Sequence, residues 1–221
     1  MKLTAVEIIC VIAPGVALTV ASWRGWLPLD LTETLGFVTG AICVYLVVRE
    51  NIWNFPLGLV NNIFFLLLFT RARLYGDAGL QLIYLALGIH GWRNWLRGGQ
   101  NQTRLPVSRA SWRFLALLVC LIIAGTASLL TILRIAGGAA PLPDALTTIL
   151  SLAAQYMLNR KLIENWYCWI IADVMYIWLY LTRGLGLTAV LYAIFLCLCL
   201  AGLWQWRRSL SPQPRATENI V

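Results

Sequence analysis

Long apolar runs separated by short polar stretches follow one another along the whole chain. Eight runs are candidate membrane-spanning helices, at residues 4–22, 34–49, 52–70, 77–96, 114–134, 144–159, 164–182 and 187–206. A helix needs about 20 mostly apolar residues to cross a bilayer, and tilt or local thinning accommodates a shorter run. The pattern therefore predicts an all-α integral membrane protein with eight transmembrane helices.

The first run has the length of a secretory signal peptide. It contains Glu7 and Pro14, has a single lysine before it, and shows no clear cleavage site ahead of Trp23. We therefore expect the first run to be a retained helix.

The composition agrees with a membrane protein: 60% of the 221 residues are hydrophobic and 12% are charged. The 17 Lys and Arg against 9 Asp and Glu give a net charge of +8. Because these cations flank apolar runs, they indicate topology rather than nucleic-acid binding. Threading eight spans places five on one side (Arg24, Arg71, Arg73, Arg134 and Arg183) and twelve on the other (Lys2, Arg49, Arg93, Arg97, Arg104, Arg109, Arg113, Arg160, Lys161, Arg207, Arg208 and Arg215). Both termini are therefore expected in the cytoplasm.

Motifs for metal or nucleotide chemistry are missing from the sequence. The chain has one histidine, His90, and no HExxH, P-loop or GxGxxG, and its six cysteines form no C-x-x-C. We expect no cofactor, no metal, no nucleic-acid partner and no disulfide. A membrane-embedded lipid enzyme is a poor alternative, because that chemistry usually needs clustered His, Asp, Glu or Cys.

Two halves of the chain resemble one another when the sequence is shifted by 111 residues without a gap. About a quarter of positions 45–95 are then identical to their partners. The informative matches are Tyr45 with Tyr156, Arg49 with Arg160, Asn54 with Asn165, Gly91 with Gly202, and Trp95 with Trp206. Asn, Arg, Gly and Trp on one ungapped diagonal are harder to obtain by chance than Leu in apolar helices.

The repeat predicts a domain organisation of 1 + (3+1+3) helices. An N-terminal helix and loop (1–33) precede a first three-helix repeat (34–96), a cytoplasmic loop and linking helix (97–143), a second repeat (144–207) and a cytoplasmic tail (208–221). Three spans leave the chain on the opposite side of the membrane, and the linking helix returns it to the side where the first repeat began. Both repeats therefore cross the membrane in the same direction and are parallel. In repeat-built transporters the substrate site lies near the midplane where the repeats meet.

The seventh run carries the strongest candidate site. Five residues at spacings of 3, 4, 3 and 4 share one helical face, which we call the stripe: Trp166, Trp169, Asp173, Tyr176 and Tyr180. A carboxylate at mid-bilayer costs about 2.5–3.5 kcal/mol on insertion scales. An aromatic face around one carboxylate suits a planar organic cation, since each ring offers about 0.5–2 kcal/mol of cation–π attraction.

Other roles for these residues remain open. Trp166 and Tyr180 can equally be interfacial anchors, and Asp173 can pair with an arginine or relay a proton. No Lys or Arg lies at mid-span, however, which leaves an ion pair without an obvious partner. On the repeat diagonal Asp173 matches Asn62, whose alternative role is to join helices by hydrogen bonding.

Three further polar residues lie inside or near the spans, where structural and functional roles are equally plausible. Gln81 and Tyr84 are one turn apart on the fourth span, so they can face the same cavity, and Gln155 lies on the sixth span. Together with Asn62 and the first four residues of the stripe, they complete the set of candidate substrate-binding residues: Asp173, Trp169, Trp166, Asn62, Gln81, Tyr176, Gln155 and Tyr84.

Three stretches resemble the bacterial nicotinamide riboside transporter family, PnuC. They are "NIWNFPLGLVNNIFFLLLF", "RLYGDAGLQLIYLALGIHGWRNW" and "RKLIENWYCWIIADVMYIWLYLTRGLGLTAVLYAIFLCLCLAGLWQW", within residues 34–207. The resemblance implies a SWEET-like seven-helix core with an extra N-terminal helix, and a homotrimer in the bacterial inner membrane. It also implies facilitated diffusion of an unphosphorylated vitamin that a cytosolic kinase then traps. It places binding residues near Gln81, Trp166, Trp169 and Asp173.

Nicotinamide riboside, an NAD precursor, suits the cation site because its pyridinium is flat and charged. Its ribose hydroxyls could bond to Asn62, Gln81 or Gln155. Related branches of the family carry thiamine, riboflavin or deoxynucleosides. Thiamine is also an aromatic cation, so Asp173 does not separate the two, whereas riboflavin and deoxynucleosides are uncharged. Nicotinamide riboside is therefore the first expectation and thiamine the alternative.

Overall fold

Each apolar run forms a helix in the computed structural model of the chain. The structure describes residues 5–26, 31–71, 75–137, 141–184 and 186–210, with the side chains of 5–12, 33 and 75–77 left aside. These ranges contain a short 3-10 helix, Gln100–Gln102, and the α-helices α1 (Ala5–Trp23), α2 (Leu31–Val48), α3 (Asn54–Arg71), α4 (Tyr75–Arg97), α5 (Trp112–Ile135), α6 (Pro141–Asn159), α7 (Asn165–Thr182) and α8 (Gly186–Ser209).

The prediction of eight helices is confirmed for the described residues, and each predicted run ends within three residues of a helix end. The first run forms one continuous helix with Pro14 inside it. The residues before Ala5 and after Leu210 lie outside the described part, and with them Lys2, Arg215 and the predicted tail beyond residue 210, while the first two tail residues, 208 and 209, continue α8. Arg73 also lies outside the described residues.

Local chemistry explains where several helices begin and end. The hydroxyl of Ser111 accepts a hydrogen bond of 3.3 Å from the backbone N–H of Phe114, which caps the start of α5. Pro141 opens α6, at a position where a missing N–H costs no helical hydrogen bond. Beyond the end of α7, Gly184 adopts a φ of 72°, a left-handed conformation that glycine reaches without steric cost. The apolar runs are thus separated by specific turn residues.

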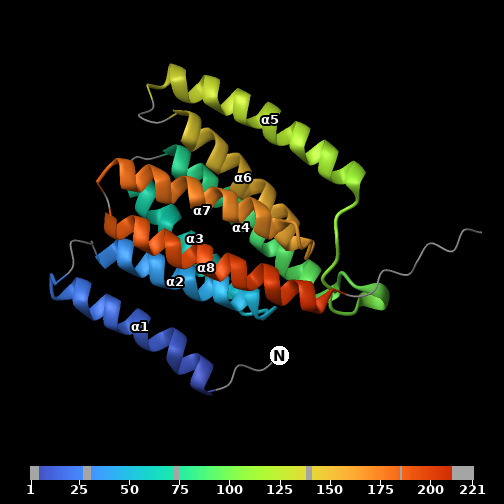
Figure 1. Ribbon diagram of the computed structural model, residues 1–221, viewed down its shortest axis with the longest axis horizontal. Coiled ribbons are helices and arrows are strands. Elements are labelled where there is room, and N and C mark those ends of the chain that lie inside the picture. The colour runs from blue at the N-terminus through green and yellow to red at the C-terminus, as the bar shows by residue number, and fades with distance from the viewer. Residues whose placement is uncertain (1–4, 27–30, 72–74, 138–140, 185, 211–221) are drawn as a thin grey trace, which may run out of the picture.

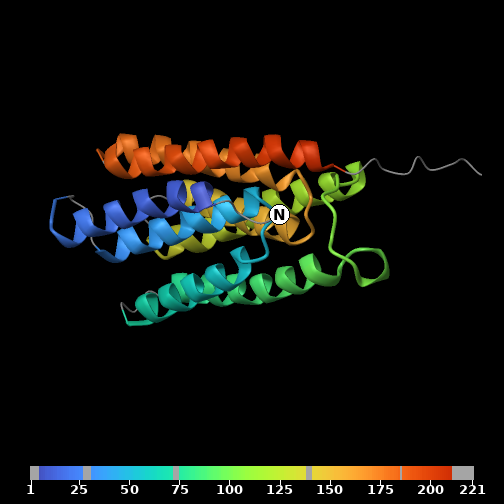
Figure 2. The same cartoon turned by 90° about the horizontal axis from the view of Figure 1, so that it is seen from below.

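The helices lie side by side along the long axis of the molecule (Figure 1). In Figure 2, α7 and α8 form one outer layer, α3 and α4 form the opposite one, and α2 and α6 lie between them. The contacts agree, because α2 packs against α3 and α8, whereas α6 packs against α7 and α4. The outermost helices are α1, which contacts α2, and α5, which contacts α6. The four central contacts enclose a space between the two layers.

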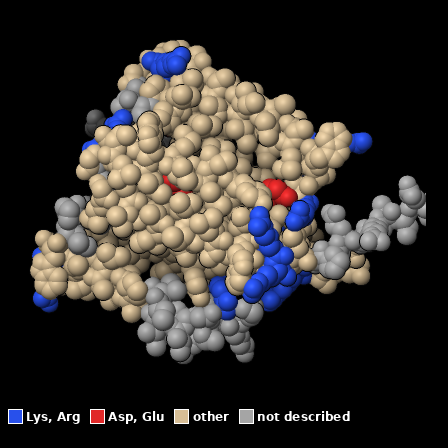
Figure 3. Space-filling model, viewed as in Figure 1, with Lys and Arg blue, Asp and Glu red and all other residues tan. Residues whose placement is uncertain are grey.

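Basic side chains gather at one end of the bundle, which we call the Arg-rich end and define by Arg49, Arg97, Arg109, Arg160 and Arg207. Figure 3 shows Lys and Arg concentrated over this end, whereas the broad side of the bundle is almost free of charge. Large apolar side chains are exposed on that side, and no residue of α5 is buried.

Two helices within the described residues, Trp112–Ile135 and Gly186–Ser209, are long and apolar enough to cross a membrane by length and composition. Shorter apolar helices occur at Ala13–Trp23 and Thr34–Val48. The exposed apolar surface around the bundle is what a lipid-facing exterior requires, because hydrocarbon chains solvate such side chains without cost.

The connection between α4 and α5 is ordered against the second half of the protein. The backbone of Ser108 exchanges two hydrogen bonds of 3.0 Å with Lys161 and Ile163, and the N–H of Ala110 donates to Glu164 Oε2 at 3.0 Å. Val107 is buried beside them, at 2% exposure. This polar segment, predicted as a cytoplasmic loop, is therefore docked on the Arg-rich end.

Candidate functional site

A cavity of about 480 Å³ lies among α2, α3, α4, α6, α7 and α8. Pockets for small organic ligands typically measure about 300–1,000 Å³, so this one is large enough for a vitamin. Its wall includes the polar side chains Asn54, Asn61, Asn62, Tyr84, Thr148, Ser151, Gln155, Asp173, Tyr176 and Tyr192. Because the cavity is bounded by both outer layers and both central helices, each half of the chain contributes to it.

Asp173 carries the only formal charge among the described residues that line this cavity. Its side chain is buried, with 6% exposure, and α7 presents it towards α8. There the thiol of Cys199 donates a hydrogen bond to Asp173 Oδ2, with a separation of 3.3 Å. One weak hydrogen bond satisfies a carboxylate poorly. The site therefore suits a ligand that brings a positive charge.

Aromatic rings surround the carboxylate. Trp166, Trp169 and Tyr176 line the cavity, as the spacing along the seventh run predicted, and Tyr192 from α8 joins them. The ring centroids of Tyr176 and Tyr192 are 4.7 Å apart. Tyr180, the last residue of the predicted stripe, stacks on both tyrosines but is not among the lining residues. The first four residues of the stripe therefore line the cavity, and the fifth, Tyr180, does not.

Trp166 has a hydrogen-bond donor without an acceptor. Its side chain is 1% exposed, yet the buried Nε1 has no hydrogen-bond partner within the described part of the chain. Leaving such a group unpaired costs about 1–3 kcal/mol. Other atoms of the Trp166 ring line the cavity, whereas Nε1 itself is enclosed by protein and does not face it.

The opposite wall comes from α3, where Asn62 lines the cavity. Its neighbour Asn61 donates a hydrogen bond of 2.6 Å to Thr39 Oγ1 of α2 and so serves to join two helices. No such bond to the described residues engages the Asn62 side chain, which leaves its amide available inside the cavity. Farther along α3, Phe65 and Phe69 stack on each other outside the cavity.

Two polar groups on the cavity wall are held by neighbours. The hydroxyls of Tyr84 and Ser151 share a hydrogen bond of 2.5 Å between α4 and α6. Gln155 donates to Asn159 Oδ1 at 3.1 Å, and Asn159 in turn donates to the backbone oxygen of Leu87 at 2.7 Å. These bonds orient Tyr84 and Gln155 before any ligand arrives.

Gln81 is the one candidate that the structure does not bring to the cavity. Tyr84 lines it, whereas Gln81 does not. Three residues advance an α-helix by about 300°, so the two side chains point about 60° apart. The prediction that both face one cavity is therefore wrong for Gln81.

Sequence reasoning missed several polar lining residues, among them Cys199, Ser151 and Tyr192. Ser151 lies one helical turn before Gln155, so this spacing could have revealed it. Cys199 lies in an apolar run without a recognisable motif, and only the packing of α8 on α7 brings its thiol to Asp173. Among the described residues no cluster of three or more His, Cys, Asp or Glu could hold a metal ion.

A helical bundle with exposed apolar surface around a polar, aromatic cavity has the features that a carrier of small solutes in a membrane requires. Residues 30–208 match the family described as "Nicotinamide mononucleotide transporter", and the chain belongs to that family. The family consists of transporters, so the protein is not an enzyme and the lipid-enzyme alternative is set aside.

Similar proteins have related descriptions. The nicotinamide riboside transporter PnuC of Escherichia coli (strain K12) is 28% identical over 215 residues, which cover 84% of this chain and 88% of that protein. The riboflavin/roseoflavin transporter RibM of Streptomyces davaonensis is 25% identical over 181 residues, covering 79% and 84%. The crystal structure of the vitamin B3 transporter PnuC has the same fold, with a TM-score of 0.70, 22% identity, and coverage of 94% and 92%.

Proposed function

We propose that this protein carries nicotinamide riboside, an NAD precursor, across the bacterial inner membrane by facilitated diffusion. A cytosolic kinase would then trap the compound as its phosphate. The observation that carries the proposal is Asp173, a carboxylate buried in an aromatic cavity where no Lys or Arg is among the described lining residues. A pyridinium supplies the missing positive charge. The similarity to nicotinamide riboside transporters of Escherichia coli and Haemophilus influenzae supports this choice of substrate.

Each part of nicotinamide riboside has a candidate partner on the cavity wall. The pyridinium ring fits beside Asp173 and the faces of Trp169 and Tyr176, where cation–π attraction contributes about 0.5–2 kcal/mol per ring. The carboxamide and the ribose hydroxyls can bond to Asn62 and Gln155, which line the cavity.

In the membrane, we infer that all eight helices span the bilayer and that the Arg-rich end faces the cytoplasm. The supporting observation is the position of the basic residues, because cytoplasmic ends of spans are enriched in Lys and Arg. Both termini would then be cytoplasmic. The exposed apolar surface of α5 and its neighbours would contact lipid.

We further propose that α2–α4 and α6–α8 are parallel three-helix repeats in a SWEET-like arrangement. Equivalent helices make equivalent contacts: α2 packs on α8 as α6 packs on α4. Equivalent residues do so as well, since Phe55 packs against Gly91 and Trp166, 111 positions later, packs against Gly202. The same shift brings α1 onto α5, and each packs on the first helix of the repeat that follows it.

The resemblance to PnuC also suggests a homotrimer, with each protomer holding its own cavity. Its test is the mass of the protein in mild detergent, measured by light scattering with the detergent contribution subtracted. A trimer is expected, and a monomer at working concentrations would contradict this part of the proposal.

Uptake into proteoliposomes tests the function. Radiolabelled nicotinamide riboside should enter sealed vesicles without a proton or sodium gradient, and unlabelled compound trapped inside should exchange with it. Uptake that depends strictly on an ion gradient would contradict facilitated diffusion. Binding without any passage across the membrane would indicate a receptor instead of a carrier.

Asp173→Asn tests the counter-charge. Removing one member of a buried charge pair costs about 2 kcal/mol or more, so nicotinamide riboside should bind about 30-fold more weakly. The uncharged dihydro form of the compound is the matched control, and its affinity should change much less. An equal loss for both compounds would exclude a counter-charge role.

Two other substrates are to be compared in the same titration. Thiamine is an aromatic cation and meets the same charge requirement at Asp173. Riboflavin is the substrate named for a relative, RibM, but it is uncharged and gives Asp173 no counter-ion. Binding of riboflavin tighter than that of both cations would overturn the cation interpretation of this cavity.

A further inference from the structure

An ion pair between a buried lysine and a partly exposed glutamate joins the two halves of the protein outside the cavity. Lys161 Nζ lies 2.9 Å from Glu50 Oε2, and its side chain is 7% exposed. Glu50 follows α2 and Lys161 follows α6, at positions that are 111 residues apart. Both residues have a φ of 50°, a left-handed conformation that is uncommon for a residue with a Cβ. Such backbone conformations concentrate at functional and switching positions.

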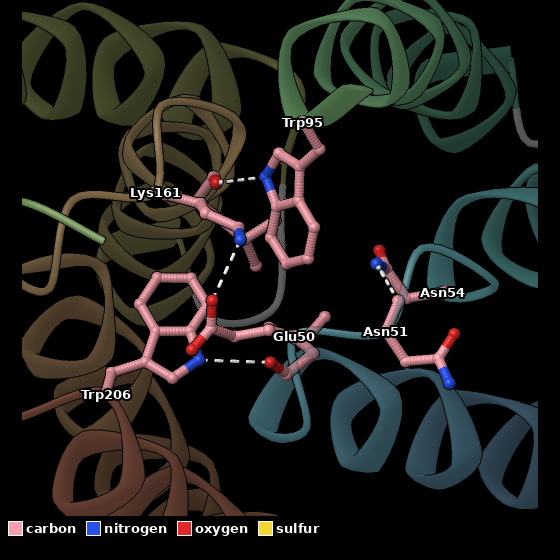
Figure 4. A network of polar contacts seen from close by, with 8 residues as sticks. Glu50, Asn51, Asn54, Trp95, Lys161 and Trp206 are labelled. Atoms are coloured by element: carbon pink, nitrogen blue, oxygen red, sulfur yellow. Dashed lines mark hydrogen bonds and ion pairs between the residues drawn. The ribbon is translucent and has the colours of Figure 1, made fainter. Parts of the chain in front are cut away.

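Two tryptophans cross between the halves beside this pair (Figure 4). Trp95 Nε1 of α4 donates to the backbone oxygen of Leu158 at 3.0 Å. Trp206 Nε1 of α8 donates to the backbone oxygen of Val47 at 3.1 Å. The two donors are 111 positions apart, and so are the two acceptors, so each half reaches into the other in the same way. Lys161 Nζ lies 4.5 Å above the Trp95 ring, which links the ion pair to the tryptophans.

The pair and the two tryptophans lie directly behind one end of the cavity. Val47 and Leu158, whose carbonyls accept the tryptophan hydrogen bonds, line the cavity themselves. Glu50 follows Val47 by three residues and Lys161 follows Leu158 by three residues, in both cases towards the Arg-rich end. The ion pair and the tryptophans therefore adjoin the wall of the cavity on its side towards the Arg-rich end.

We propose that Glu50, Lys161, Trp95 and Trp206 form a gate that closes the cavity at the Arg-rich end and opens once per transport cycle. The inference rests on the proposed transport function. All three hydrogen-bonded or ionic contacts run between α2–α4 and α6–α8, so the halves can separate there without unfolding a helix. A partly exposed ion pair contributes little net stability compared with apolar packing, which suits a contact that must break repeatedly.

Accessibility of a cavity cysteine tests the gate independently of any substrate. Cys43 lines the cavity and is kept as the single cysteine of the chain. A charged, membrane-impermeant thiol reagent is added from the Arg-rich side of oriented, sealed vesicles. The double variant Glu50→Gln with Lys161→Met, which leaves no unpaired charge, should be labelled at Cys43 at least tenfold faster. Arg109→Gln, an exposed charge at the same end, is the control and should not change the rate.

Exchanging the charges checks that pairing itself holds the gate closed. Glu50→Lys with Lys161→Glu keeps an ion pair and should be labelled at least threefold more slowly than the neutral double variant. Unchanged labelling in the neutral variant, or no recovery in the exchanged one, would overturn the proposal. Neither labelling result depends on which compound is transported. The proposed substrate can therefore be wrong while the gate proposal is supported, and the two outcomes can be told apart.

A reversible cross-link gives the complementary test. Cysteines at Glu50 and Lys161, in a background without other cysteines, are joined by a short reducible bifunctional thiol reagent. The cross-linked protein should still bind nicotinamide riboside but transport it at least tenfold more slowly, and reduction should restore the rate. Full transport by fully cross-linked protein would show that this contact need not open.

Discussion

A tight contact between the last two helices predicts the effect of one added methyl group. Gly202 on α8 is buried against the ring of Trp166 on α7. A Cβ at Gly202 would overlap the Cη2 and Cζ2 atoms of this ring and lie 2.7 Å from Cε2. Because the ring is 1% exposed, it has no free space to move into, and α8 or the indole must shift.

The magnitude follows from a comparison of two glycine substitutions. At Gly79 on α4, no atom lies within 4 Å of the position that a Cβ would take, so Gly79→Ala gains only the better helix propensity of Ala, about 1 kcal/mol. Gly202→Ala gains the same propensity but adds overpacking, which costs about 3 kcal/mol at a site this tight. The two variants should therefore differ by about 3 kcal/mol, with Gly202→Ala the less stable.

Thermal unfolding in detergent measures this difference. At about 2–4 °C per kcal/mol for a chain of this size, Gly202→Ala should melt about 6–12 °C below Gly79→Ala. Its affinity for nicotinamide riboside should also fall, because the displaced Trp166 ring lines the cavity. Equal melting temperatures and equal affinities for the two variants would refute the packing argument, and with it the position of Trp166.

Three further substitutions test single contacts. Tyr84→Phe removes the hydrogen bond to Ser151 and should lower the apparent unfolding free energy by about 1 kcal/mol, measured by thermal shift; no change would mean that this bond forms only transiently. Asn62→Ala should weaken nicotinamide riboside binding by calorimetry while leaving the melting temperature within about 2 °C, and a large loss of stability would instead assign Asn62 a helix-joining role. Glu164→Gln weakens the bond to the Ala110 N–H, so limited proteolysis should cleave the α4–α5 connection faster, whereas unchanged cleavage would show that the loop is held by other contacts.

Much of the fold could be predicted from hydrophobicity alone. A run of apolar residues bounded by charges can satisfy its backbone only as a helix in lipid, so length and composition were enough for every helix. The same reasoning placed Trp166, Trp169, Asp173 and Tyr176 on one face, since helical geometry depends only on spacing.

The cavity itself required the packing of the helices. Gln81 and Tyr84 have equally suitable positions in the sequence, yet only Tyr84 lines the cavity, because the rotation of α4 against α6 selects one face. Cys199 became a site residue for the same reason, when α8 brought its thiol to Asp173. Helix rotation depends on many side-chain contacts at once, and no local pattern encodes it.

The sequence by itself determined the helices, the basic end, the repeated halves and the carboxylate on an aromatic face. These features depend on composition and on short spacings, which a chain carries before it folds. Only the tertiary structure decided that Glu50 meets Lys161 and that each tryptophan reaches a carbonyl of the other half. These partners are 111, 63 and 159 residues apart, so they meet only after both halves have packed, because no local interaction brings such distant positions together.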